Sequence, residues 1–292
     1  MTLPPADTVV LFPDGTTSAD AVVLHTEPRS DGRLAVLLDR TPVHPVDPGW
    51  PDQGADRATV TANGTAAPLD DAVVGATDGT ALYVGEDVPV RRGTEGWAFV
   101  VVHLLAGDAP LAEGDAVRVQ VDERLRRSLS AGHTACHLAS LALDAALAES
   151  WTKPVDADPL GAPAFDRLAI ERSTILPGGA EDAYRVGKSL RRRGFDPAAL
   201  GDTDTIAAAA DALLAAWLGT GAGVRIERTA DGLGDLREWV CDLPEGTARL
   251  ACGGTHLASL GELEAVTVRL ETAVVPGATT LTMTTTARLR DA

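Results

Sequence analysis

The first 120 or so residues alternate short apolar runs with polar turns. The turns contain the dipeptides Asp14-Gly15, Asp31-Gly32, Asn63-Gly64 and Asp78-Gly79, which accept the positive φ angles of tight hairpins. Many short strands at this spacing predict a small β-barrel-like domain, which we place at residues 1–122. The predicted strands, rich in valine and leucine, are Thr8–Phe12, Ala21–Thr26, Leu34–Leu38, Leu82–Val84, Phe99–His103 and Asp115–Val121.

The pattern changes after residue 122. The Ala- and Leu-rich segments Arg124–Glu149 and Ile206–Leu218 contain no proline and predict helices. We therefore predict an α+β chain whose second domain, residues 123–292, combines helices with an antiparallel sheet. The strand-like runs of this part are Val224–Arg228, Trp239–Leu243, Ala265–Leu270 and Thr279–Leu289.

Composition and charge narrow the class of protein. The chain has 292 residues and is 45% hydrophobic, which excludes a wholly disordered protein. Its net charge of −17 argues against a protein that coats nucleic acid or anionic membrane by charge alone. Three cysteines at wide spacings, and an N-terminus without the basic and apolar regions of a signal peptide, indicate a reducing compartment. We expect a cytoplasmic protein with neither a membrane nor DNA as partner.

Two short motifs carry the candidate chemistry. The first, Gly132-His133-Thr134-Ala135-Cys136-His137, lies in the first predicted helix. Because residues four positions apart share one face of a helix, His133 and His137 can bind the same metal ion. The second motif, Cys252-Gly253-Gly254-Thr255-His256, follows about 115 residues later and places a thiol and an imidazole on either side of a glycine turn.

Each motif alone has an ordinary interpretation. A histidine pair at this spacing usually lies on the surface or makes ordinary packing contacts, and a single Cys-Gly-Gly-Thr-His segment is a weak signal of metal binding. Together, three imidazoles and one thiolate form a tetrahedral donor set that suits zinc. We therefore predict Zn²⁺ as the cofactor, with His133, His137, Cys252 and His256 as its ligands.

The two motifs resemble the metal motifs of the alanyl-tRNA synthetase editing domain and of its free-standing relatives, the AlaX family. Further likeness lies in Asp122–Arg127, Leu38–Pro45 and Gly261–Leu263. The resemblance covers most of the chain and is weakest between about 150 and 205. It implies an α/β zinc-binding editing domain that acts in trans as an aminoacyl-tRNA deacylase, a metal-dependent carboxylic ester hydrolase. Its partner would be the aminoacylated acceptor end of a mischarged tRNA, with the zinc ligands at the catalytic centre. Such editing is needed because a synthetase separates similar side chains by only about 1–3 kcal/mol.

The chain departs from the family at the Gly-Gly-Gln signature that lines the amino-acid pocket. The corresponding stretch, Asp47–Gln53, contains Trp50 and two prolines, and proline fixes φ and removes a donor. The resemblance therefore supports the reaction class better than a seryl or glycyl substrate. A threonyl-type acid or an analogue such as fluorothreonine is the alternative. In this region we expect Thr41, His44, Asp52 and Gln53 to read the amino acid, although such residues in a proline-rich loop are equally often turn residues.

Cys136 is a further candidate for the pocket. It lies about 60° round the predicted helix from His133. A cysteine on a helix is more often a packed apolar thiol than a nucleophile, so we assign it to substrate binding and not to covalent catalysis.

The role of the metal stays open at this point. Four protein ligands close a tetrahedral site, and closed sites are normally structural. Either one ligand, with Cys252 the first suspect, is distant or replaceable, or the metal expands its coordination, or zinc only positions the substrate.

Basic residues gather in two segments despite the acidic total. A charge run is most often a solvated helix face, but arginines can also bind the phosphates of tRNA. From Arg124–Arg127 and Lys188–Arg193, the residues that we assign to tRNA binding are Arg126, Arg127, Lys188, Arg191, Arg192 and Arg193.

Two other classes of protein remain as alternatives. One is a zinc-dependent hydrolase of a small acylated metabolite that acts without nucleic acid. The other is a zinc-stabilised binding module without catalysis. The sequence does not distinguish oligomeric states.

Overall fold

The computed structural model describes residues 3–290, which form two compact units. Unit 1 consists of the chain up to residue 126 together with residues 226–237 and 253–255. Unit 2 consists of residues 127–225, 238–252 and the chain from 256 onwards. The fold is a mixture of helices and antiparallel strands, as the sequence predicts. Whether residues 1–122 and 123–292 are separate domains stays a prediction.

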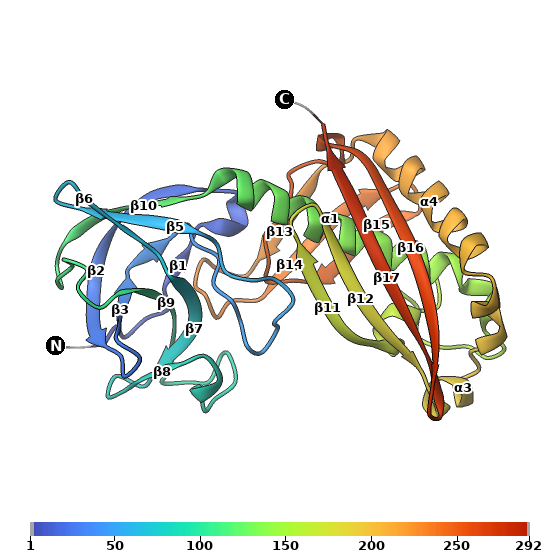
Figure 1. Ribbon diagram of the computed structural model, residues 1–292, viewed down its shortest axis with the longest axis horizontal. Coiled ribbons are helices and arrows are strands. Elements are labelled where there is room, and N and C mark those ends of the chain that lie inside the picture. Colours follow the sequence, from blue (N-terminus) through green and yellow to red (C-terminus); the bar gives the residue numbers. More distant parts are fainter. Residues whose placement is uncertain (1–2, 291–292) are drawn as a thin grey trace. The chain divides into compact units, whose positions relative to one another are not determined.

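A curled, eight-stranded antiparallel sheet dominates unit 1 (Figure 1). Its strand order is β6-β5-β10-β2-β3-β9-β7-β8, and β1 pairs with β4 in parallel beside it. Three of the predicted turn dipeptides join hydrogen-bonded neighbours, β2 to β3, β5 to β6 and β7 to β8. The strands are β1 Val9–Val10, β2 Ser18–Pro28, β3 Arg33–Leu38, β4 Arg40–Thr41, β5 Ala58–Ala62, β6 Thr65–Pro68, β7 Asp71–Thr77, β8 Leu82–Val84, β9 Ala98–Ala106 and β10 Ala116–Val121.

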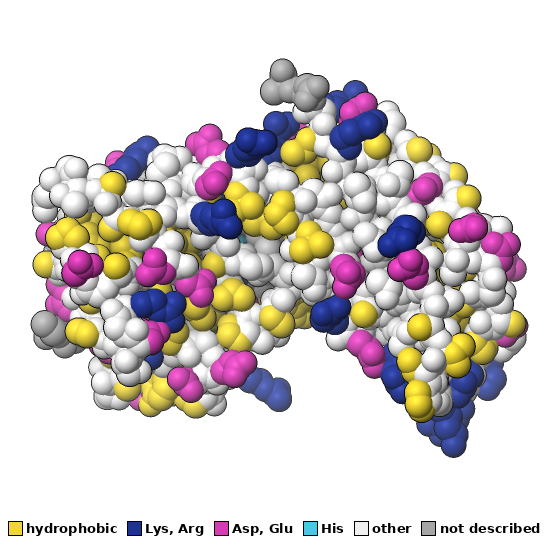
Figure 2. All heavy atoms as spheres, viewed as in Figure 1, with side chains coloured by type: hydrophobic (Ala, Val, Ile, Leu, Met, Phe, Trp, Pro, Cys, Tyr) yellow, Lys and Arg dark blue, Asp and Glu magenta, His cyan; other side chains and the backbone are white. Residues whose placement is uncertain are grey.

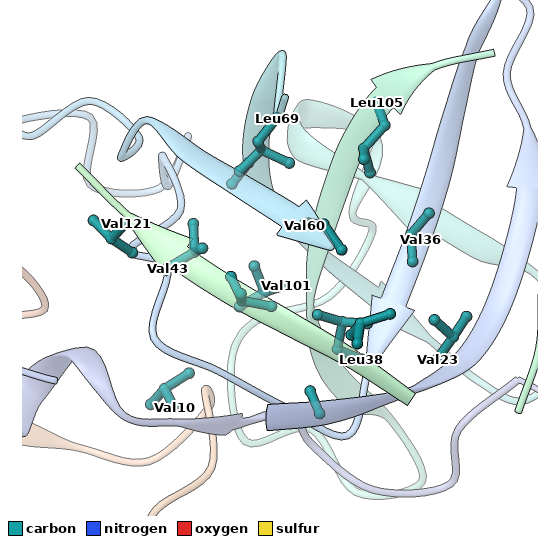
Figure 3. Close-up of a cluster of buried hydrophobic side chains, with 14 of the residues drawn as sticks. Val10, Val23, Val36, Leu38, Val43, Val60, Leu69, Val101, Leu105 and Val121 are labelled. Atoms are coloured by element: carbon teal, nitrogen blue, oxygen red, sulfur yellow. The ribbon is translucent and has the colours of Figure 1, made fainter. Parts of the chain in front are cut away.

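Alternating side chains of these strands fill the interior of unit 1. Figure 3 shows Val23, Val36, Val60 and Val101 converging from β2, β3, β5 and β9, with Leu105 further along β9. This core is almost entirely aliphatic, which fits a chain with only 4% aromatic residues. In β2 and β10 only one face is buried, which fixes their register, because a slip by one residue would turn their apolar side chains outward.

One predicted strand is largely wrong. Only Val9 and Val10 of the segment Thr8–Phe12 are extended, and Phe12–Asp14 forms a 3₁₀ turn. Pro13 favours this turn because it fixes φ and has no amide proton. Gly15 ends it at a φ of 74°, a conformation that glycine adopts without strain.

Unit 2 contains a four-stranded antiparallel sheet of order β11-β12-β17-β16 (Figure 1). Helix α4 lies along β16, where Asp211 of the helix accepts a hydrogen bond of 2.8 Å from the backbone amide of Val268. A second sheet, of order β13-β14-β15, belongs only partly to unit 2, since residues 226–228 of β13 are in unit 1. The strands are β11 Ile170–Leu176, β12 Gly179–Val186, β13 Val224–Arg228, β14 Arg237–Leu243, β15 Gly246–Ala251, β16 Leu263–Val275 and β17 Ala278–Leu289. The helices are α1 Glu123–Ala146, α2 Phe165–Ala169, α3 Lys188–Arg192 and α4 Thr203–Thr220.

Helix α1 packs very closely on the turn between β11 and β12. A Cβ atom at Gly132 would lie 2.3 Å from the carbonyl oxygen of Leu176 and 2.4 Å from that of Gly179. Only glycine permits this approach of backbone to backbone. Gly132 therefore fixes the position of the helix immediately before His133.

Within residues 3–290, none of the helices combines the length and apolar character that crossing a bilayer requires.

Candidate functional site

The structure brings the four predicted ligands together in unit 2. His133 and His137 are on successive turns of α1, and Cys252 and His256 follow strand β15. Their candidate ligand atoms all lie within 4.8 Å of one another. The Sγ atom of Cys252 is 3.3 Å from Nε2 of His133 and 3.2 Å from Nε2 of His256. Cys252 is therefore not distant from the other three, and this cluster can hold a metal ion.

A zinc ion, which the resemblance implies, fits these side chains. The Nε2 atom of His137 is buried and has no hydrogen-bond partner in the described part of the chain. Buried polar atoms nearly always have a hydrogen-bond partner, so this nitrogen is suited to coordinate a metal ion. Burial lowers the pKa of His137 to about 4, which keeps the ring neutral and able to coordinate. Three nitrogens and one sulfur are the donors that zinc prefers.

Thr134 orients the imidazole of His256 through Nδ1, the ring nitrogen that does not face Cys252. Its Oγ1 atom lies 3.4 Å from Nδ1 of His256 and accepts a hydrogen bond of 3.1 Å from the amide of Leu257. Contacts of this kind fix the tautomer and direction of a ligating histidine. Sequence reasoning gave Thr134 no role. The signal that the sequence offered was its position next to His133, inside the first motif.

Gln53 of unit 1 holds the turn of the second motif. Its Nε2 donates to Thr255 Oγ1 at 3.0 Å, and the amide of Thr255 donates to its Oε1 at 3.1 Å. The side chain is 1% exposed. Gln53 thus positions the residue that precedes His256 in the chain, and we no longer count it among the substrate contacts.

His44 and Asp52 line a small pocket in unit 1, together with Phe12, Trp50, Arg92 and Arg237. The Nδ1 atom of His44 lies 3.3 Å from the carbonyl oxygen of Gly54 and donates to it. The other nitrogen, Nε2, is therefore a hydrogen-bond acceptor. Burial lowers the pKa of His44 to about 4, so that this acceptor stays unprotonated at neutral pH.

Asp52 is held by its neighbours in the pocket loop. The Nε1 atom of Trp50 donates to Asp52 Oδ2 at 2.9 Å, and the amide of Gln53 donates to Oδ1 at 2.7 Å. Burial raises the pKa of Asp52 to about 6, although these hydrogen bonds act in the opposite direction. Trp50, which stands in the stretch that corresponds to the Gly-Gly-Gln signature, thus has Asp52 as a hydrogen-bond partner.

Two of the expected substrate contacts are buried and contact other side chains of the protein. The hydroxyl of Thr41 is 2.8 Å from Nε2 of His103, and both residues are fully buried. The Sγ atom of Cys136 faces Asp182 at 3.6 Å and Ser173 at 3.7 Å. Burial and the carboxylate of Asp182 raise the pKa of this thiol well above its usual value. We therefore withdraw Thr41 and Cys136 from the set of substrate contacts.

Arg126 is also placed differently from expectation. It is 3% exposed, forms an ion pair with the buried Asp56 and donates to the carbonyl oxygen of Pro42 at 2.7 Å. The second oxygen of Asp56 accepts from Arg126 Nε at 2.9 Å. An arginine enclosed in this way supports unit 1, and we withdraw it from the set of tRNA contacts. Sequence analysis missed Asp56 because a single aspartate in a polar loop carries no pattern.

The other basic residues are more accessible. Arg127 lies 3.7 Å from Glu262, and both side chains are partly exposed. Lys188, Arg191, Arg192 and Arg193 are all exposed, on or directly after α3.

Comparison with known proteins gives weak similarity to one kind of enzyme. The chain is 30% identical to an alanine–tRNA ligase of Synechococcus over 267 residues, which cover 89% of this chain and 26% of the ligase. It is 29% identical to an alanine–tRNA ligase of Frankia alni over 164 residues, covering 56% of this chain and 17% of the ligase. The chain thus spans about a quarter or less of the length of these relatives. No family model matches it.

Proposed function

We propose that the protein is a trans-editing aminoacyl-tRNA deacylase, which hydrolyses the ester between a wrong amino acid and tRNA. The observation that carries this proposal is the convergence of His133, His137, Cys252 and His256 from two distant motifs. The similarity to an alanine–tRNA ligase over 89% of the chain supports tRNA as the substrate.

In this proposal the four side chains hold zinc. When bound, zinc supplies a Lewis acid for a carbonyl group or for water. Thr134 keeps the imidazole of His256 in one orientation, and Gly132 lets α1 reach the position from which both helical histidines point to the cluster. Preorganisation of this kind removes reorientation from the reaction barrier.

We further propose that His44 and Asp52 read the amino acid. An unprotonated Nε2 on His44 can accept a hydrogen bond from a side-chain hydroxyl, and Asp52 offers a carboxylate to an ammonium group. A site built to bind a hydroxyl discriminates strongly against substrates that lack it. Seryl and threonyl-type acids, including hydroxylated analogues such as fluorothreonine, therefore fit better than glycine.

The test is a deacylation panel of seryl-, glycyl-, alanyl- and threonyl-tRNA, with zinc measured on the same samples. The chain offers a matched pair of variants, Cys252→Ser in the cluster and Cys241→Ser, a buried cysteine on β14 outside it. We expect Cys252→Ser to lose zinc and to slow deacylation by at least about tenfold, as loss of a ligand or its support does. Cys241→Ser should keep both.

Two results would contradict the proposal. If zinc-loaded protein releases no amino acid from any tRNA on the panel, the substrate class is wrong. If it instead cleaves small acylated esters at a rate that ribonuclease treatment of the sample leaves unchanged, the protein is a metabolite hydrolase.

A further inference from the structure

The basic residues of the described chain fall into two groups. Most arginines lie against a carboxylate, for example Arg172 against Glu181, Arg269 against Glu271 and Arg288 against Glu264. Apart from Arg290, five exposed cations of unit 2 have no acidic group within ion-pair distance in residues 3–290: Lys153, Lys188, Arg191, Arg192 and Arg193. We call this group the α3 tip. Dark blue side chains gather at the corresponding place, at the lower right of Figure 2.

The α3 tip is built from three chain segments that are tied together. Leu190 anchors the short helix by its burial. Arg191 donates to the carbonyl oxygen of Gly277 in the β16–β17 turn at 3.2 Å, and Lys153 donates to that of Arg192 at 3.1 Å. The cations are thus held near one another although no carboxylate of the described residues lies within ion-pair distance of them. Such an arrangement favours a polyanion as partner, all the more in a chain of net charge −17.

The tip lies well away from the metal cluster within unit 2. Gly132, the residue before His133, packs on the backbone of Gly179, where β12 begins. Strand β12 runs from there for 8 residues and leads directly into α3. At about 3.3 Å per residue this strand spans roughly 25 Å. A phosphate at the tip is therefore several nucleotides away from an ester at the cluster.

We propose that the α3 tip binds backbone phosphates of the double-helical arm of tRNA that continues from the acceptor stem into the T arm. This inference rests on the proposed function, because it places the ester at the metal cluster. Lys and Arg contacts to phosphate give affinity and orientation without reading sequence. The rest of the chain is acidic and repels RNA. The α3 tip therefore determines the direction from which the tRNA arm approaches the protein.

The experiment measures binding of uncharged RNA, so that it does not depend on hydrolysis. One probe is a minihelix that contains the acceptor stem and the T arm, and the other is a shorter hairpin of the acceptor stem alone. The test variant is K188S/R192S/R193S, which removes three exposed side chains that form no ion pair within residues 3–290. The matched control is R172S/R269S/R288S, which removes three exposed, ion-paired arginines of unit 2 and changes the net charge equally.

We expect the test variant to bind the minihelix about 10- to 100-fold more weakly at about 0.1 M salt, and the slope of log K against log salt to fall by about 2 to 3. The control should weaken binding far less. Binding of the short hairpin should change little in either variant. The inference is overturned if both triple variants bind the minihelix equally well, or if the test variant loses the short hairpin as strongly as the minihelix.

Two additional measurements distinguish an RNA contact from a membrane contact and separate the tip from the proposed function. Tip-dependent binding to vesicles that contain phosphatidylserine, without tip-dependent binding to RNA, would replace the inference with a membrane contact. Tip-dependent RNA binding by a protein that deacylates no tRNA would leave the tip as an RNA-binding surface and remove the proposed function alone.

Discussion

Two arginine-rich segments of this chain look alike in sequence and behave differently in the structure. In Arg124–Arg127, Arg126 is buried against Asp56, and Arg127 lies beside Glu262. In Lys188–Arg193, four cations stay exposed and have no carboxylate partner in the described chain. A run of positive charge therefore does not define a nucleic-acid contact by itself. Its meaning depends on which acidic groups the fold places against it.

The largest effect should come from breaking the buried pair of the first segment. Replacing Arg126 by leucine leaves Asp56 buried without its cation. We expect the free energy of unfolding, measured by urea denaturation, to fall by about 3–5 kcal/mol.

The double variant R126L/D56N is the control for this prediction. It removes both charges, so much of the loss should be recovered. A single variant as stable as the parent would show that Arg126 has no structural role and would return it to the set of possible tRNA contacts.

A second prediction concerns a buried carboxylate that is not paired with an arginine. Asp144 is 3% exposed and accepts a hydrogen bond of 2.6 Å from the amide of Asp166. Burial, assisted by Asp166 and Asp158, raises its pKa to about 8. The folded protein thus keeps this proton up to about pH 8, whereas the unfolded chain releases it near pH 4. The free energy of unfolding should therefore fall as the pH rises from about 4 to 8.

Asp144→Asn tests this sign, since asparagine imitates the protonated carboxyl group and keeps the acceptor oxygen. We expect the variant and the parent to unfold at similar urea concentrations near pH 4. At pH 8 the variant should be more stable, by an amount on the order of a few kcal/mol. Parallel stability curves across this pH range would refute the prediction.

The smallest effect should come from Arg127, whose pair with Glu262 is partly exposed and 3.7 Å long. Arg127→Gln should change the free energy of unfolding by less than about 1 kcal/mol, because water and salt screen such pairs. The same urea titration measures it. A loss as large as that of Arg126→Leu would remove the distinction between the buried and the exposed arginine of this segment.

The accuracy of the sequence predictions follows the strength of the local signal. The sequence predicts Leu82–Val84 and Val224–Arg228 with the observed bounds, because the first is an apolar run after a turn and the second alternates apolar with charged residues. It does not predict β11 and β12, since segments such as Ile170–Leu176 are half-exposed and show no regular alternation of apolar and polar residues. One of the two partners of β12 is β17, about a hundred residues further along the chain, and local periodicity contains no information about such pairing.

The same division holds at the candidate site. The spacing of His133 and His137 on a helix, and of Cys252 and His256 around a glycine turn, could be read from the sequence because both are local. That Gln53 holds Thr255, that Thr134 orients His256 and that Thr41 faces His103 could not be read. Each of these contacts joins residues more than 60 positions apart.

The sequence by itself determined the four candidate metal ligands, the positions of the tight turns and the presence of two basic segments. These depend on side-chain chemistry and on backbone preferences over a few residues. Only the tertiary structure decided which polar groups are buried, what faces them and which cations of the described chain remain without a partner. Burial raises the free-energy cost of an unpaired charge, so the buried Arg126 is paired with Asp56. The cations of the α3 tip are exposed, and they can therefore bind a partner molecule.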